Sequence, residues 1–387
     1  CAPDPACGAD PLEEKETALA RKAATEGVLT TTQHYDFTQW LETPDGYSLP
    51  SIGKGDTTDP YRIWISEIIL QQTRVAQGYD YFLRFVRRFP TVDTLSAASQ
   101  DEVMQLWEGL GYYSRARNLH AAARQIVEHG TFPTDYAGVR ALKGVGDYTA
   151  AAICSFAYGL PTAVVDGNVY RVLARHFGLS TPIDTTAGKK QFADLAARLI
   201  DPHRPAAYNQ AIMDFGATQC TPRSPRCLVC PLADSCAALA AGTIEALPVK
   251  SKKTTVAHRH FVYLILQTTE GEMLVHRRPT GDIWAGLYEP PLLEFPEMPS
   301  LATLVDHPAV HALGPGLTFR PVVLGLTHVL THRRIHADCY LVTHLDSARL
   351  GHHPLWGDYR RLSLAERSTV AFPRLVNILF DHLDRRE

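Results

Sequence analysis

Apolar residues recur at helical spacing through the middle of the chain, from Tyr61 to about Gly216. Proline and glycine interrupt this pattern at residues 89–90, 130–133, 159–161 and 201–202, and such residues are typical of helix ends. The spacing of the breaks indicates roughly eight to ten helices. We therefore predict an all-α region over residues 31–219.

The pattern changes near residue 258, where two runs of apolar and β-branched residues, 260–267 and 272–276, flank a Glu270-Gly271 turn. Such a pair of runs is typical of a β-hairpin. We predict a separate α+β domain over residues 258–387. Residues 241–257 form a predicted linker, and the stretch 247–260 carries four Lys or Arg and no acid, so it can lie along phosphates.

The composition, 45% hydrophobic and 20% charged over 387 residues, is that of a globular protein with two or three buried cores. No apolar run approaches the eighteen or so residues that span a bilayer, so we expect no membrane association. Residues 1–30, rich in Ala, Pro, Glu and Asp and including Cys1 and Cys7, are predicted to be a poorly ordered extension. Nothing in the pattern indicates an oligomer, and we expect a monomer.

The net charge of -3 and the pI near 6.7, taken alone, argue against a nucleic-acid-binding protein. Phosphate contacts need only a local basic face, however. Between residues 110 and 127 the chain carries Arg115, Arg117 and Arg124 and no acid. Charge alone does not distinguish a phosphate-binding face from a solvated helix face here.

Four of the eight cysteines lie within seventeen residues, in the spacing C-x6-C-x2-C-x5-C. Four thiolates in a segment this short can hold zinc or a [4Fe-4S] cluster, and the compact spacing favours either over two disulfides. Spacing alone leaves zinc and iron–sulfur open. The ligands, within a predicted cluster loop over residues 220–240, are Cys220, Cys227, Cys230 and Cys236.

The order of three motifs decides between the two metals. A glycine-bent turn, LKGVGDYTA at 142–150, is followed by VVDGNV at 164–169 and then by the cysteines. This arrangement resembles the endonuclease III superfamily of helix-hairpin-helix DNA glycosylases, and within it the MutY-type adenine DNA glycosylases. Strings at 66–73, 110–119 and 209–217 extend the resemblance over about residues 35 to 350. The resemblance implies a two-lobed helical glycosylase with a [4Fe-4S] cluster loop.

Glu67 is a lone carboxylate in an apolar helical run, and burial would raise its pKa as a general acid requires. A single Glu on a helix is otherwise often solvent-facing, but the resemblance places the catalytic acid here. Asp166 is a predicted helix cap, and the family uses the matching Asp to stabilise the cationic sugar. The resemblance adds Asn168 to the catalytic set. Protonating adenine at N7 and opposing the sugar cation divides the work as in glycoside hydrolysis.

Tyr148 stands where lyase relatives carry a lysine that attacks the sugar as a Schiff-base nucleophile. A phenol cannot form an imine. The resemblance therefore implies a monofunctional glycosylase that uses water and leaves an abasic site.

The remaining predicted contacts concern DNA. The turn at 144–146 lets backbone N–H groups approach a phosphate, although an ordinary tight turn is its default interpretation. Side chains after the catalytic helix can read or displace bases, and an apolar or aromatic pair can wedge into the stack. Asp214 resembles an additional acidic pocket residue. The predicted set is Gln71, Gln72, Thr73, Leu110, Tyr112, Gly144, Val145, Gly146 and Asp214.

The C-terminal domain resembles the Nudix-like domain of adenine glycosylases through the string DIWAGLYE at 282–289. The glutamate-rich metal helix of working Nudix hydrolases is missing, so we expect no pyrophosphatase activity. The family recognises 8-oxoguanine with a Phe-Ser-His loop, which here reads Leu330-Thr331-His332. The hydroxyl and the imidazole are kept, so the resemblance implies that Thr331 and His332 contact the lesion. A second departure is Ser51-Ile52 in place of Trp-Arg, where Lys54 can partly replace the charge.

These interpretations together predict a bacterial, cytoplasmic base-excision-repair enzyme associated with the nucleoid. Its expected partner is duplex DNA holding adenine opposite 8-oxoguanine, or opposite guanine. An endonuclease III-like lyase on oxidised pyrimidines and a catalytically inactive lesion-binding paralogue are the alternatives.

Overall fold

The computed structural model describes residues 58–73, 75–251, 256–345, 352–355, 357–363 and 365–385. The predicted extension over 1–30 and the departures at Ser51, Ile52 and Lys54 lie outside these residues. The chain divides into two compact units, Cys1–Ser96 with Ala121–Lys253 and Ala97–His120 with Thr254–Glu387.

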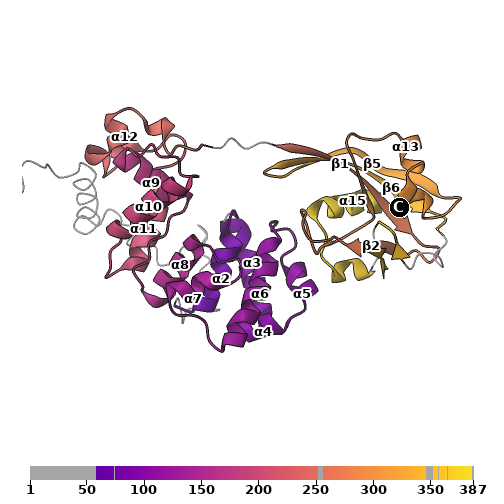
Figure 1. The fold of residues 1–387 in the computed structure, drawn as a ribbon, viewed down its shortest axis with the longest axis horizontal. Helices are drawn as coiled ribbons and strands as arrows, with labels where there is room; N and C mark the ends of the chain where they lie inside the picture. Colours follow the sequence, from indigo (N-terminus) through magenta and orange to yellow (C-terminus); the bar gives the residue numbers. More distant parts are fainter. Residues whose placement is uncertain are drawn as a thin grey trace, which may run out of the picture. The chain divides into compact units, whose positions relative to one another are not determined.

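The described chain from residue 60 to residue 246 is entirely helical apart from its connections, as predicted (Figure 1). Its α-helices are α2 Pro60–Leu70, α3 Val75–Arg88, α4 Val92–Ala97, α5 Gln100–Leu106, α6 Ser114–His129, α7 Tyr136–Ala141, α8 Asp147–Tyr158, α9 Gly167–Phe177, α10 Thr186–Leu199, α11 Pro205–Thr218 and α12 Ala237–Ala240. Short 3-10 turns, η2 Cys227–Val229, η3 Ala233–Ser235 and η4 Ile244–Ala246, surround the last of these. No helix in the described ranges is long and apolar enough to cross a bilayer.

Helix α2 is a core helix of the first unit. Asp59 caps its first turn, accepting the Tyr61 N–H at 2.9 Å, and Pro60 occupies the first helical position. Its positions from Tyr61 to Ile69 are almost all buried, and α8, which packs against it, is equally apolar and rich in small residues. A helix that is apolar all round belongs inside the protein, so a polar side chain on α2 is forced into the core.

The second unit is built on a mixed sheet with strand order β3-β2-β1-β6-β5. Strands β1 and β6 are parallel, whereas β1–β2 and β5–β6 are antiparallel. The predicted hairpin is confirmed, with Gly271 in the left-handed region at its turn (φ 81°). The strands are β1 Ala257–Gln267, β2 Met273–Arg277, β3 Tyr288–Glu289, β4 Leu292–Phe295, β5 Thr318–Val329, β6 Arg333–Thr343, β7 His352–His353, β8 Gly357–Asp358 and β9 Arg360–Leu362.

Helices cover both faces of this sheet. Helix α15 (Arg374–Asp384) packs on one face, against a core that includes Phe261, Tyr263 and Val275 (Figure 1, yellow). The short helices α13 (Leu301–Val305) and α14 (Pro308–His311) lie against the other face. The predicted α+β domain is therefore confirmed as a sheet between two helical layers, with η6 (Ala365–Thr369) preceding α15.

Residues 97–120, which fall within the predicted helical region, group with this second unit. Polar contacts join them to it: Arg277 pairs with Asp101, Asn377 donates to Glu108, and Arg117 donates to the Ala285 carbonyl. The second unit thus combines two stretches of sequence that are far apart along the chain.

Candidate active site

Glu67 is buried on α2, with 5% of its surface exposed. Burial raises the pKa of its carboxyl group to about 7, because a charge there loses its hydration. The negative charge of Asp166 raises this pKa further, while a hydrogen bond from Tyr148 opposes the shift. The side chain therefore carries a proton over part of the neutral range.

Asp166 is the N-cap of α9. Its Oδ1 accepts the N–H groups of Asn168 at 2.9 Å and Val169 at 2.8 Å, and its Oδ2 accepts the Asn168 side-chain amide at 2.9 Å. Burial raises its pKa although these bonds and the charge of Arg171 act in the opposite direction. The predicted cap is confirmed, and the carboxylate is held in a single orientation by three donors.

Glu67, Asp166 and Tyr148 act electrostatically on one another, so the fold brings these three predicted residues together. Burial and the two nearby carboxylates raise the pKa of Tyr148 well above its usual value. The phenol therefore stays protonated and serves as a hydrogen-bond donor. Its hydroxyl lies 3.6 Å from the sulfur of Met213 on α11.

Asn168 connects this cluster to the segment that follows α11. Its Oδ1 accepts from Arg171 at 2.9 Å, and Arg171 also donates to the carbonyls of Gly216 at 2.5 Å and Cys220 at 2.7 Å. A Cβ on Gly216 would stand 2.7 Å from the Cβ of Asn168, so only glycine allows α11 to pass this closely. The arginine thus links the Asp166–Asn168 pair to the first cysteine.

The 144–146 turn leads into α8 and leaves the start of this helix without a side-chain cap. Gly144 adopts a left-handed conformation (φ 78°), Val145 is buried, and Gly146 is the N-cap of α8 with no side-chain cap bond. A Cβ on Gly146 would meet nothing within 4 Å, so packing does not demand glycine there. Space over the first N–H groups of a helix suits an approaching phosphate.

The other predicted DNA-contacting residues differ in exposure. Gln71 is half-buried and donates to the Thr149 hydroxyl at 3.1 Å, whereas Gln72 is exposed with a positive φ of 57°. Thr73 is half-buried, and its hydroxyl lies 3.4 Å from the Gln71 carbonyl. Of these three side chains, Gln72 is the most open to a ligand.

Leu110 and Tyr112, the two predicted wedge residues, differ in exposure. Leu110 is buried, which argues against insertion between bases, whereas Tyr112 is 46% exposed with a positive φ of 47°. Asp214 is buried on α11, where Gln210 donates to one carboxylate oxygen at 3.1 Å and the other has no hydrogen-bond partner among the described residues. Burial raises the pKa of Asp214 as well.

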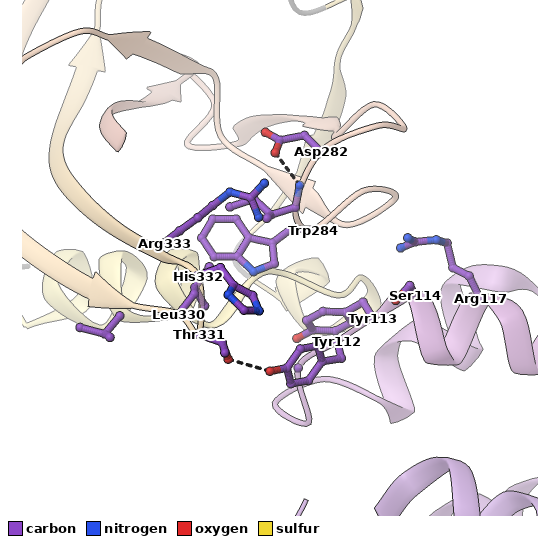
Figure 2. Close-up of a pocket in the computed structure, with 13 residues that line it drawn as sticks. Tyr112, Tyr113, Ser114, Arg117, Asp282, Trp284, Leu330, Thr331, His332 and Arg333 are labelled. Carbon is purple, nitrogen blue, oxygen red and sulfur yellow. Dashed lines mark hydrogen bonds between the residues drawn. The ribbon is translucent and has the colours of Figure 1, made fainter. Parts of the chain in front are cut away.

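A cavity of about 400 Å³ lies within the second unit. Figure 2 shows the side chains that line it. The turn between β5 and β6 supplies Thr331 and His332, and a loop after β2 supplies Trp284. The hydroxyl groups of Tyr112 and Thr331 are 2.7 Å apart at its edge. The cavity therefore brings together three residues predicted to contact DNA, namely Tyr112, Thr331 and His332.

The four cysteines line one small cavity in the first unit. Burial, and then the neighbouring thiols, raise the pKa of Cys230. Arg175 approaches the Cys220 sulfur at 3.5 Å. In the described part of the chain, no three His, Cys, Asp or Glu side chains stand close enough to hold a single metal ion. Four thiols around one small cavity are a ligand set that suits an iron–sulfur cluster or a zinc ion.

Comparison with family models gives three matches along the chain. Residues 65–198 match the HhH-GPD superfamily of base excision DNA repair proteins. Residues 220–236 match the iron–sulfur binding domain of endonuclease III, and residues 262–382 match the NUDIX domain. Residues 65–198 belong to the HhH-GPD superfamily. Its cysteine segment is an iron–sulfur segment for a [4Fe-4S] cluster, and its second unit contains a NUDIX domain.

Curated relatives of this HhH-GPD chain include two named adenine DNA glycosylase. The Rattus norvegicus protein is 46% identical over 194 residues, which are 49% of this chain and 38% of the relative. The protein of Buchnera aphidicola subsp. Baizongia pistaciae is 36% identical over 237 residues, 59% of this chain and 66% of the relative. The chain thus spans less than two thirds of the length of these relatives.

A solved structure of a thermostable thymine-DNA glycosylase is similar to this chain. The likeness has a TM-score of 0.50 at 26% identity and covers 60% of this chain and 100% of that one. It supports the predicted helical glycosylase fold.

Sequence reasoning missed two residues of the cavity. Trp284 was noted only as part of a family string, and Arg333 was not singled out, although it follows Thr331-His332 directly. Among the described residues, no hydrogen bond or ion pair involves the Arg333 guanidinium. The positive charge of Arg333 beside Thr331-His332 is the sequence signal that could have identified this residue.

Proposed function

We propose that this protein is a monofunctional DNA glycosylase that removes adenine opposite 8-oxoguanine, or opposite guanine, from duplex DNA. The observation that carries the proposal is Glu67, a buried carboxyl group with a pKa of about 7 beside Asp166 and Tyr148. The names of the two curated relatives support adenine as the base.

Glu67 is the proposed proton donor. Transfer of its proton to adenine N7 lets the bond between C1′ and N9 break with its electron pair moving into a neutral leaving base. The sugar is left as an oxocarbenium-like cation, and Asp166 opposes this charge from a fixed position. Because three donors already orient Asp166, little reorganisation is needed when the charge develops.

A water molecule completes the proposed reaction. It adds to C1′ and returns a proton to the Glu67 carboxylate, so an abasic site and free adenine are the products. Tyr148 donates a hydrogen bond and stays protonated, and it has no amine with which to form an imine. Strand cleavage is therefore not part of the proposed activity.

DNA is held at two proposed places. Gly144, Val145 and Gly146 present backbone N–H groups to a phosphate at the start of α8, and Gln72 faces the bases. In the second unit, Thr331 and His332 offer hydrogen-bonding groups to 8-oxoguanine, with Tyr112 as the wedge. A flipped adenine must reach Glu67, since a buried acid cannot protonate a stacked base.

Cys220, Cys227, Cys230 and Cys236 are the proposed cluster ligands. The cluster, when bound, ties the loop together as a structural element. Arg171 and Arg175 donate to carbonyls of this loop, which fixes it to α9, the helix that begins at Asp166.

The test uses duplexes with one 8-oxoguanine:adenine, guanine:adenine or guanine:thymine pair, incubated with the protein and analysed with and without alkali. The proposal predicts breaks only after alkali, at the adenine strand, and free adenine by chromatography. Breaks without alkali would indicate a lyase, binding without breaks an inactive paralogue, and cleavage at thymine a thymine glycosylase. Each of these three results contradicts the proposal.

A further inference from the structure

Trp284 lines the cavity that also contains Thr331 and His332, and its backbone is strained. Its φ is 59°, in the left-handed region that a bulky side chain rarely adopts. Such strain persists only where the surroundings fix the conformation, and it concentrates at functional sites.

Two arginines fix the turn. Arg278 donates to the Ile283 carbonyl at 2.7 Å and to Asp282 at 2.6 Å, so both residues before Trp284 are held. Arg259, on β1, forms a bidentate salt bridge with Asp282, with both N–O distances 2.7 Å. It forms a second bidentate salt bridge with Glu294 on β4, at 2.7 and 2.6 Å. The turn is therefore anchored to two strands of the sheet.

One pair of this network, Arg278 with Glu289, is buried and costly to build. Arg278 is 6% exposed and donates to Glu289, which is 1% exposed, at 2.7 and 2.9 Å. Well-packed apolar residues often stabilise a fold as well as a buried ion pair does. The network is therefore better explained by the fixed geometry it imposes on the Asp282–Trp284 turn than by stability.

The indole of Trp284 is supported from behind and open to the cavity. It packs edge-on against Phe261 at 6.5 Å and His328 at 6.0 Å between ring centroids. Trp284 lines the cavity together with Thr331 and His332 (Figure 2). A rigid aromatic ring in a cavity that also offers polar groups suits stacking against a nucleobase.

We propose that Trp284 is a specificity-determining residue that stacks on the oxidised purine in this cavity, and that Arg259 and Arg278 are positioning residues that hold its ring. This inference rests on the proposed function and adds to it the surface that contacts the purine's face. Thr331 and His332 are left to read the purine's edge.

The first test compares Trp284→Gly with Trp284→Phe. Glycine accepts the positive φ without strain, which offsets part of the packing lost against Phe261 and His328, so we expect a folded protein with a lower melting temperature and no ring. The affinity ratio between 8-oxoguanine:adenine and guanine:adenine duplexes, measured with a non-cleavable adenine analogue, should fall at least about tenfold. Trp284→Phe should keep most of the ratio. A folded Trp284→Gly protein with the wild-type ratio would overturn the inference.

The positioning role is tested with Arg259→Lys, which keeps the charge and loses the bidentate geometry. We expect the affinity ratio to fall in the wild-type background and to change little further in the Trp284→Gly background. A merely structural arginine would lower affinity for both duplexes equally in both backgrounds. That equal loss would contradict the positioning role.

The two proposals fail in different ways. If the wild-type protein releases no adenine from either duplex, the proposed function is wrong, and the binding ratios still decide whether Trp284 contacts the purine. If the wild-type protein releases adenine and Trp284→Gly keeps the full ratio, the inference alone is wrong.

Discussion

The surroundings of Glu67 in the first unit and of Glu289 in the second differ although the two side chains share one property. Both are buried, at 5% and 1% exposure, and burial raises the pKa of each to about 7. Glu289 accepts two hydrogen bonds from Arg278. Among the described residues, the groups acting on Glu67 are the Tyr148 phenol and the Asp166 carboxylate, and neither is a cation.

This contrast teaches that a raised pKa does not by itself identify an acid catalyst. Glu289 forms an ion pair with the buried Arg278 guanidinium, so its charge has a structural role. Glu67 stands beside another carboxylate, which makes the protonated form more favourable and leaves its proton free to move. The neighbours of a buried carboxyl group, rather than its raised pKa alone, distinguish a catalytic group from a structural one.

Replacement of the catalytic candidate gives the largest expected effect. Glu67→Gln keeps the shape and hydrogen-bonding capacity of the side chain but removes the transferable proton. We expect single-turnover adenine release to fall about 10²- to 10⁴-fold, with duplex affinity retained in a gel-shift assay. A Glu67→Gln variant that keeps wild-type turnover would show that Glu67 is not the proton donor.

Asp166→Asn separates the cap from the charge. Asparagine caps helices as well as aspartate does, so the melting temperature should stay close to that of the wild type. Adenine release should fall about 10²- to 10³-fold, because a fixed charge no longer opposes the sugar cation. A variant that melts much earlier and retains its rate would show that Asp166 serves only as a cap.

Glu289→Gln is the matched change in the second unit. It leaves the buried Arg278 without its anion, and breaking such a pair costs about 3 kcal/mol or more of unfolding free energy. Urea unfolding measures this loss. Single-turnover adenine release by the folded variant at saturating protein, assayed well below its melting temperature, should remain within a fewfold of wild type, because Arg278 acts through Trp284 on duplex affinity. A catalytic collapse without a loss of stability would contradict a structural role for Glu289.

Tyr148→Phe sharpens the account of Glu67 with the smallest expected effect. The phenol's hydrogen bond lowers the Glu67 pKa, so its removal should raise that pKa further. The fall of the rate at high pH should move to higher pH in a single-turnover profile. Movement to lower pH would show that Tyr148 does not donate to Glu67.

Much of the first unit could be predicted from local sequence, because its signals are local. An apolar run on every side of Glu67 implies burial, and an Asp before Gly167-Asn168 implies a cap. The structure has both features. Leu110 shows the limit of this reasoning, since its neighbours do not reveal whether it faces the core or the ligand.

The cavity wall could not be predicted, because its parts come from different strands. Arg259 lies on β1, Glu289 on β3 and Glu294 on β4, and only the sheet's pairing assembles the network in which Arg259 and Arg278 hold Asp282. The positive φ of Trp284 likewise has no local sequence signal, because tryptophan does not favour that conformation. In the same way, Arg171 reaches Cys220 across 49 residues of sequence.

The most direct test of the central claim, that Glu67 carries the proton for adenine at neutral pH, is the single-turnover rate of adenine release between pH 5 and pH 9. Because the acid form is the active one and exists below its pKa, the rate should fall as pH rises through about 7. Glu67→Gln should lack this fall. A wild-type rate that stays level or increases from pH 7 to pH 9 would contradict the claim.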